Sequence, residues 1–328
     1  MMAPDTVRRC GLVLVAWEDR AETWADLRRI AREVTALAPQ IDARVVGHHR
    51  GEQLRLLPLW LRPTLSLSLI DKPSAKWLPG RFMAGRRLGK IGEYRRLDAA
   101  SMPVPRWVVI EPDTRLDPAE WGPYVVEKPS MGRLGAFVRI RRTGRVRYVP
   151  PASLPEGHYG RLGPMLAQTF VYTGEWPVSY RVVTLLGEVL VCYRQVTRGR
   201  GTPLVDRWRF RDSGGLSIVS NTDEMQIELD ADPGVIALAE AAHRVAFADI
   251  PILNFDIVRD AQTGALWILE VHTHGGWLFS SEQGLGIQQQ NGVNFGSQFD
   301  GLSKAARVLV AQTPRLAGWR WGDAPARA

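Results

Sequence analysis

Two adjoining segments near residue 260 constrain the fold of this chain more than any other feature. Apolar and polar residues alternate along residues 252–258, with Leu253, Phe255 and Ile257 on one side and Asn254 and Asp256 on the other. A second alternating run follows at residues 265–272, after a turn that ends in Gly264. This pattern predicts an antiparallel hairpin with one core face and one polar face.

The register of this hairpin places acidic side chains opposite each other. If the turn is centred near Thr263, Asp256 lies across from Glu270, and Asn254 lies across from His272. Opposed side chains are roughly 5 Å apart at Cβ, and two carboxylates that close repel unless a cation lies between them or one is protonated. A divalent-metal site at Asp256, Glu270 and His272 is one interpretation, and a solvated polar sheet face is the other.

The segments around this hairpin predict a mixed α/β fold. Asp232 followed by Pro233 is typical of a helix start, and apolar spacing predicts a helix through residue 246. The N-terminal segment reads as strand, helix and strand at residues 11–17, 24–37 and 43–46, a small βαβ layer. With 328 residues the chain is long enough for two or three subdomains, and the prolines at 103 and 105 mark a boundary.

Composition favours a globular protein with anionic partners. The chain is 45% hydrophobic and 23% charged, with a formal charge of +8. This excess of basic residues favours binding of nucleic acid and binding of nucleotide phosphates equally. The only cysteines, Cys10 and Cys192, fall in apolar runs, which favours buried thiols in a reducing cytoplasmic compartment. No apolar run approaches the length of a membrane span, so neither a membrane segment nor a signal peptide is expected.

A glycine-bearing loop lies between two predicted strands at residues 124–128 and 136–140. Backbone N–H groups of such a loop can surround phosphates, and Lys128 at its base supplies a positive charge. An ordinary hairpin connection is the alternative.

A second predicted hairpin turns at Gly187-Glu188. In that register Arg181 lies opposite Arg194, an arrangement that favours an anion between the two guanidinium groups, unless both extend into solvent. The arginine- and glycine-rich residues 198–215 are predicted to be a loop over the site. His48 and His49 follow a predicted strand. Their side chains are either solvated or act as ligands.

These pieces, in this order, resemble the ATP-grasp family of ligases. The residues that carry the resemblance are Lys90, VVEKPSMGRLGAFV, LAQTFVYTGE, YRVVTLLGEVLVCYRQ, NFDIV and LWILEVH, across residues 81–277. Among its subtypes the chain looks closest to carboxylate–amine ligases, including those that modify peptides and the glutathione-synthetase type. The resemblance implies a Rossmann-like N-terminal domain (1–104), a small central lid subdomain (105–172) and a C-terminal antiparallel-sheet subdomain (173–328).

The resemblance also assigns roles residue by residue. Lys90 and Lys128 would hold ATP phosphates, and Ser130, Gly132 and Gly135 would belong to the lid loop. Gln168, Thr169, Phe170 and Val171 would contact adenine. Asp256, Glu270 and His272 would bind magnesium or manganese ions. Arg181 and Arg194 would cradle the transferred phosphoryl group.

The implied reaction is ATP-dependent joining of a carboxylate to an amine through an acyl-phosphate, with release of ADP and phosphate. His272 stands where the family usually has asparagine, which predicts a preference for Mn²⁺ over Mg²⁺. Thr169 replaces a frequent glutamate, and Ser179 a frequent acidic residue. The alternatives are an ester-forming or peptide-modifying enzyme, a degenerate nucleotide-binding protein and a basic nucleic-acid binder. A homodimer is also an expectation, while the two substrates stay unassigned.

Overall fold

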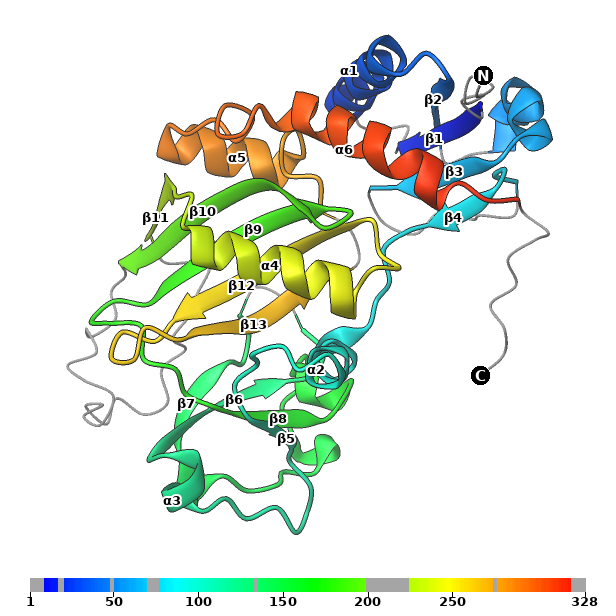
Figure 1. Ribbon diagram of the computed structural model, residues 1–328. Helices are drawn as coiled ribbons and strands as arrows, with labels where there is room; N and C mark the ends of the chain where they lie inside the picture. The colour runs from blue at the N-terminus through cyan, green and yellow to red at the C-terminus, as the bar shows by residue number, and fades with distance from the viewer. Residues whose placement is uncertain are drawn as a thin grey trace, which may run out of the picture.

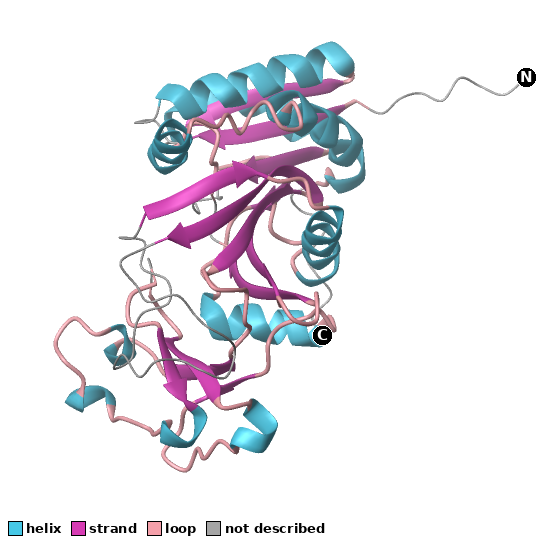
Figure 2. Cartoon of the chain, turned by 90° about the vertical axis from the view of Figure 1, so that its left-hand side faces the viewer, coloured by secondary structure: helices cyan, strands magenta, loops and turns pink. Residues whose placement is uncertain are grey.

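The computed structural model describes residues 9–16, 21–47, 50–69, 77–132, 135–198, 224–273 and 276–319. It is a mixed α/β structure with three sheets, and both views show the sheets one above another along the molecule (Figures 1 and 2). This confirms the predicted fold class. Among the described residues, no helix combines the length and the apolar character that a membrane crossing needs.

The N-terminal sheet is parallel, with strand order β2-β1-β3-β4. Its strands are β1 (Cys10–Ala16), β2 (Ile41–Gly47), β3 (Thr64–Ser68) and β4 (Arg81–Met83). Helix α1 (Ala21–Leu37) connects β1 to β2, so the predicted βαβ unit is present. A 3₁₀ segment, η1 (Arg50–Leu61), precedes β3.

The middle sheet is antiparallel, with strand order β11-β10-β9-β12-β13. Its strands are β9 (Val178–Leu185), β10 (Glu188–Arg198), β11 (Glu224–Leu229), β12 (Ile252–Arg259) and β13 (Leu266–His272). Helix α4 (Pro233–Ala246) covers one face. Helix α6 (Gly301–Leu316) packs on the other face and joins it to the N-terminal sheet in one apolar cluster, while α5 (Glu282–Asn291) lies beside β11.

The third sheet is also antiparallel, with order β5-β8-β6-β7. Its strands are β5 (Trp107–Val109), β6 (Tyr124–Pro129), β7 (Arg139–Arg142) and β8 (Met165–Thr169). The short elements are α3 (Pro118–Trp121), η2 (Thr143–Arg145), η3 (Pro151–Ser153) and η4 (Tyr159–Arg161). Helix α2 (Gly89–Ala99) connects this sheet with the middle one, because its buried Tyr94 and Leu97 share a cluster with Leu166 of β8 and with the α4 face. Each sheet falls inside one of the three predicted segments, and the domain division itself stays a prediction.

Local predictions differ from the structure in several places. Residues 284–292 are rich in glycine and polar residues, a composition that predicts a loop, yet most of them belong to α5. The Ser281 hydroxyl accepts a hydrogen bond from Gly284 N, and Gly292 ends the helix at a φ of 63°. The strand expected at 136–140 begins only at Arg139, after a turn in which Phe137 has a φ of 64°. Strands β5 and β11 were not expected. His48, His49 and residues 199–215 lie outside the described residues.

The buried side chain of His243 should make the free energy of unfolding depend on pH. Its Nε2 donates to the carbonyl of Ile250 (2.9 Å), which leaves Nδ1 of the neutral ring to accept from the Thr184 hydroxyl (2.7 Å). Burial lowers the pKa of His243 to about 4, below the ordinary value of 6.5. Because the unfolded chain takes up the proton first, the contribution of His243 to the free energy of unfolding is complete above pH 6.5. It falls as the pH drops toward 4.

The loss from this group is expected to reach about 3 kcal/mol. Urea unfolding measured between pH 7 and 4 checks it. The variant His243→Gln, which does not titrate, should show a shallower slope over that interval. An identical slope in the variant and the wild type would contradict the assignment.

Candidate functional site

The hairpin of β12 and β13 places the predicted acidic pair as the sequence register requires. Asp256 pairs with Glu270 and Asn254 pairs with His272. Closer to the turn the register shifts by one residue, since Ile257 pairs with Ile268 and Leu269 is the extra residue of a β-bulge. The bulge changes the simple alternation along the predicted second strand, because Ile268 and Val271 both join the core beneath α4 while Glu270 lies on the polar face.

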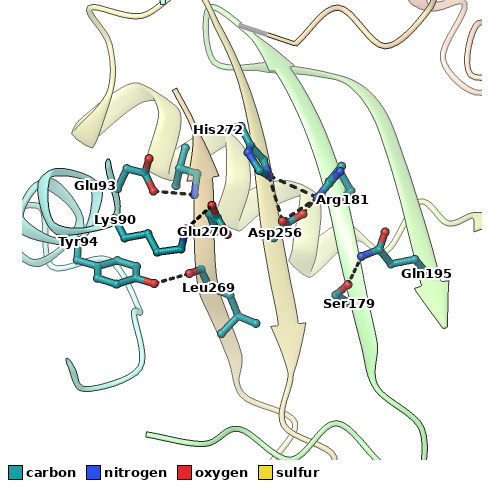
Figure 3. A network of polar contacts seen from close by, with 11 residues as sticks. Lys90, Glu93, Tyr94, Ser179, Arg181, Gln195, Asp256, Leu269, Glu270 and His272 are labelled. Atoms are coloured by element: carbon teal, nitrogen blue, oxygen red, sulfur yellow. Dashed lines mark hydrogen bonds and ion pairs between the residues drawn. The ribbon is translucent and has the colours of Figure 1, made fainter. Parts of the chain in front are cut away.

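The bulge also gives α2 a point of attachment. The carbonyl of Leu269 accepts a hydrogen bond from the Tyr94 hydroxyl (2.8 Å), as Figure 3 shows. On the same helix Lys90, one turn earlier, donates to Glu270 Oε1 (3.0 Å). Glu93, the residue before Tyr94, accepts from the backbone N–H of Val271 (3.4 Å). These residues have helical i, i+3, i+4 spacing, so a single helix face meets the polar end of β13.

Asp256 is bound by two side chains from neighbouring strands (Figure 3). Arg181 of β9 donates through Nε to Oδ1 (2.7 Å) and through Nη2 to Oδ2 (2.8 Å). His272 Nε2 lies 3.2 Å from Oδ2, and because a carboxylate only accepts, this ring nitrogen is the donor. Arg181 and Asp256 are each only 17% exposed, so the pair is held in a largely water-free position.

Lys128 joins this cluster from β6 of the third sheet. Its side chain is 6% exposed, donates to Gln168 Oε1 (2.7 Å), and lies 5.2 Å from the ring centre of Tyr94. It also interacts electrostatically with the carboxylates of Glu270, Glu93 and Asp256. Two lysines from separate elements, Lys90 and Lys128, therefore lie close to the carboxylates of the β12–β13 hairpin.

Burial and charge shift the titration of these groups. Burial lowers the pKa of Lys128 to about 8, although Glu270 acts in the opposite direction. Burial and the nearby Glu270 carboxylate raise the pKa of Glu93 to about 8, so Glu93 is protonated at neutral pH. Burial acts to raise the pKa of Asp256, but Arg181 and His272 outweigh it and hold that pKa well below its usual range. Two buried carboxyl groups of the site thus carry different protonation states.

The donor set at the hairpin fits a hard divalent cation that is shared with phosphates. Among the described residues, no group of three or more His, Cys, Asp and Glu side chains is arranged to hold a metal ion alone. Mg²⁺ is usually bound by one or two carboxylates together with substrate phosphates, so Asp256 and Glu270 suffice. The buried oxygen of Asn254, which has no hydrogen-bond partner among the described residues, adds an oxygen donor to this face.

Arg194 does not face Arg181, which corrects the sequence prediction. The turn uses Leu186 and Gly187, both at positive φ, and a bulge follows between Val189 and Val191. These two features shift the register so that Arg181 pairs with Tyr193. Arg194 instead pairs with Tyr180, whose side chain packs in the cluster beneath α4, so Arg194 lies on the opposite face of the sheet. Its ion pair is with Glu228 of β11, at 3.8 Å.

The remaining predicted residues lie around the polar cluster. Ser130 follows β6, is 4% exposed, and its carbonyl accepts from Lys90 N (3.3 Å). Gly132 and Gly135 flank two residues outside the described part of the chain. Gln168 lies on β8 and binds Lys128. Three residues at the end of β8 line a cavity of about 280 Å³ that does not include Lys128: Thr169, Phe170 and Val171.

Comparison with known proteins gave structural matches only. No protein-family model matches the sequence, and no curated protein matches it. D-alanine–D-alanine ligase from Bacillus anthracis, complexed with ATP, has a TM-score of 0.43 and 12% identity, with 93% of this chain and 98% of that chain covered. The ATP-grasp ligase PsnB, complexed with a minimal precursor, has a TM-score of 0.49 and 17% identity, with 93% and 100% covered.

A third match is a RimK domain ATP-grasp protein from Sphaerobacter thermophilus, with a TM-score of 0.42 and 16% identity over 86% and 97% of the two chains. The chain is similar in structure to ATP-grasp ligases. At these identities the similarity concerns the fold alone.

Three residues of this polar cluster were not predicted from the sequence. Glu93 and Tyr94 share a helical face with Lys90, a spacing visible in the sequence once a helix is assigned to residues 89–99. Asn254 stands on the polar side of the predicted strand, but only the structure shows that its oxygen is buried without a partner among the described residues.

The hydrogen bond from the Tyr94 hydroxyl should contribute measurably to stability, because it connects α2 to β13. The variant Tyr94→Phe leaves the Leu269 carbonyl without its donor, so the free energy of unfolding should fall by about 1–2 kcal/mol. Urea unfolding measures it, with Tyr148→Phe, at a residue 36% exposed, as the control. Equal loss in both variants would argue against a role for this hydrogen bond.

Proposed function

We propose that this protein is an ATP-dependent ligase that joins a carboxylate to an amine through an acyl-phosphate. The observation that carries the proposal is the meeting of Lys90 and Lys128 with Asp256 and Glu270. Paired lysines neutralise phosphate oxygens, and paired carboxylates hold the divalent cation that accompanies a nucleoside triphosphate. The order of sequence motifs from Lys90 to His272 supports the same reading.

Each residue has a proposed task in this reaction. Lys90 and Lys128 bind phosphate oxygens of ATP, with Ser130, Gly132 and Gly135 in the loop that closes over them. Gln168, Thr169, Phe170 and Val171 contact the nucleoside. Asp256 and Glu270 would hold a magnesium or manganese ion, which would neutralise charge on the triphosphate. His272 holds Asp256 in position.

The chemistry proceeds in two displacements. A carboxylate oxygen of the first substrate attacks the γ-phosphorus, and the bond to the β–γ bridging oxygen breaks, so ADP leaves and an acyl-phosphate forms. The amine then attacks the acyl carbon, loses a proton and expels inorganic phosphate. Positioning and charge neutralisation supply most of the rate acceleration. Arg181 is the guanidinium on the polar face that stabilises the transferred phosphoryl group; Arg194, on the opposite face, has no part in this step.

One observation favours a second candidate, a nucleotide-binding protein without turnover. Arg181 already occupies both oxygens of Asp256, and Lys90 occupies Glu270. A metal ion reaches Asp256 only if Arg181 gives up at least one of these bonds. If the pair does not open, nucleotide binds without productive metal binding.

Release of ADP from ATP in the presence of amino-acid mixtures separates the two candidates. A ligase releases ADP that depends on particular carboxylate and amine partners, with a condensed product of matching amount by mass spectrometry. Binding of ATP without substrate-dependent ADP would contradict the ligase assignment. A hydroxyl-bearing acceptor that yields an ester product would keep the acyl-phosphate step and change the second substrate.

A further inference from the structure

Asn254 is a buried amide in a position that packing alone would fill with an apolar residue. It is 5% exposed on the interior strand β12, and its strand neighbours are Val183 of β9 and His272 of β13. Val183 belongs to the apolar cluster between this sheet and α6. A buried polar group without a hydrogen bond costs about 1–3 kcal/mol. Asn254 Oδ1 has no such partner among the described residues, so its presence calls for a ligand.

The backbone near Gly276 fixes which end of the amide is available. A Cβ at Gly276 would lie 2.2 Å from Asn254 Nδ2 but 3.4 Å from Oδ1, so the nitrogen end is the one against this segment. Because side chains alternate along a strand, Asn254 shares the polar face of β12 with Asp256. The unpartnered oxygen therefore belongs to the same face as the carboxylates of Asp256 and Glu270.

His272, by contrast, has its Nε2 engaged. This nitrogen lies 3.2 Å from Asp256 Oδ2 and 3.4 Å from Arg181 Nη2, as Figure 3 shows. A nitrogen that donates its proton to a carboxylate has no lone pair for a metal. A cation that prefers oxygen ligands finds in Asn254 a neutral carbonyl oxygen of the right class.

We propose that Asn254 supplies an amide-oxygen ligand to the divalent cation of this site, and that His272 orients Asp256 rather than coordinating the metal. The inference rests on the proposed nucleotide and metal site. It reverses the expectation of a Mn²⁺ preference, because an all-oxygen ligand set serves Mg²⁺ as well as Mn²⁺.

Mn²⁺ bound with the methylene-bridged analogue AMPPCP tests the assignment without turnover. Free Mn²⁺ is measured by its EPR signal, and ligated nitrogen by electron spin-echo modulation. The analogue has no nitrogen in its phosphate bridge, so an imidazole ligand would be visible. In the wild type we expect no ligated-nitrogen coupling. Asn254→Ala should weaken Mn²⁺ binding about 10- to 100-fold, at least the loss expected when a residue that supports a metal ligand is removed.

Two further variants keep the test decisive. Asn254→Asp retains the shape and an oxygen donor, so its Mn²⁺ affinity should equal or exceed that of the wild type. Gln195→Ala removes another amide from the same face, where it binds Ser179 (2.7 Å), and should leave Mn²⁺ affinity within about twofold. Thermal unfolding without metal establishes that each variant is folded; if Asn254→Ala is unfolded, Asn254→Asp and the nitrogen signal decide.

Each outcome has one meaning. Unchanged Mn²⁺ affinity in folded Asn254→Ala, weaker binding in Asn254→Asp, or a ligated nitrogen in the wild type overturns the assignment of Asn254 while the nucleotide and metal site stands. Failure of the wild type to bind Mn²⁺ with AMPPCP overturns the proposed function, and the inference with it.

Discussion

Replacing Lys128 with methionine is expected to weaken binding of Mg²⁺ with a non-hydrolysable ATP analogue by about 100-fold, equivalent to ~2.7 kcal/mol. The ammonium group is buried, its pKa is lowered to about 8 by burial, and its hydrogen bond among the described residues is to the neutral Gln168. A phosphate would give this charge a directly bound anionic partner. Methionine has a similar shape and no charge, so the fold should be at least as stable.

Calorimetric titration of the analogue into the wild type and the variant measures this effect. Lys304→Met is the matched control, because Lys304 lies over the ring of Phe299 at 5.2 Å, on helix α6. The control should bind the analogue as the wild type does. If Lys128→Met also binds it with wild-type affinity, Lys128 does not contact the phosphates.

The variant Arg181→Ala is expected to lower the free energy of unfolding by about 3–5 kcal/mol, because it leaves the buried Asp256 carboxylate without its bidentate partner. Urea unfolding at pH 7 measures the loss. The double variant Arg181→Ala with Asp256→Asn should recover part of it, since the unpaired charge is then gone. A double variant that loses the sum of both single effects would contradict this account.

Arg194→Ala is the matched control for Arg181, because both arginines lie in the same sheet on opposite faces. Among the described residues, the ion pair of Arg194 is with Glu228 at 3.8 Å, and the Glu228 side chain is 71% exposed. Exposed ion pairs contribute roughly 0–1 kcal/mol, so this variant should be nearly as stable as the wild type. A loss as large as that of Arg181→Ala would mean that the assignment of faces is wrong.

Local signals were enough to predict the hairpin at the centre of the site. The cap at Asp232, the turn before Gly264 and the period-two alternation each act over a few residues, and the structure confirms helix α4, both strands and the pairing of Asp256 with Glu270. The predicted order of strand, helix and strand at the N-terminus is also confirmed, because β1 and β2 carry strong apolar patterns.

Register beyond a bulge could not be predicted in the same way. A single extra residue moves every later side chain to the other face, and nothing in the sequence near Leu190 or Leu269 marks the extra residue. Arg194 was misplaced for this reason. Helix α5 was missed because its glycines and glutamines lack an apolar period, and the helix depends instead on Ser281 and Gly292 at its ends.

Contacts between elements distant in sequence could not be predicted from the sequence either. The approach of Tyr94 to Leu269, and of Lys128 to the carboxylates of the hairpin, depends on how α2 fits between two sheets. The resemblance to ATP-grasp ligases named Lys90 and Lys128 as phosphate ligands, but the structure is needed to show that they share one site with Glu270.

A structure of the protein with Mn²⁺ and a non-hydrolysable ATP analogue tests the central claim most directly. The account predicts the triphosphate between the side-chain nitrogens of Lys90 and Lys128, with the anomalous peak of the metal next to Asp256 and Glu270. A nucleotide bound elsewhere on the protein, or a metal ion with neither carboxylate as a ligand, would contradict it.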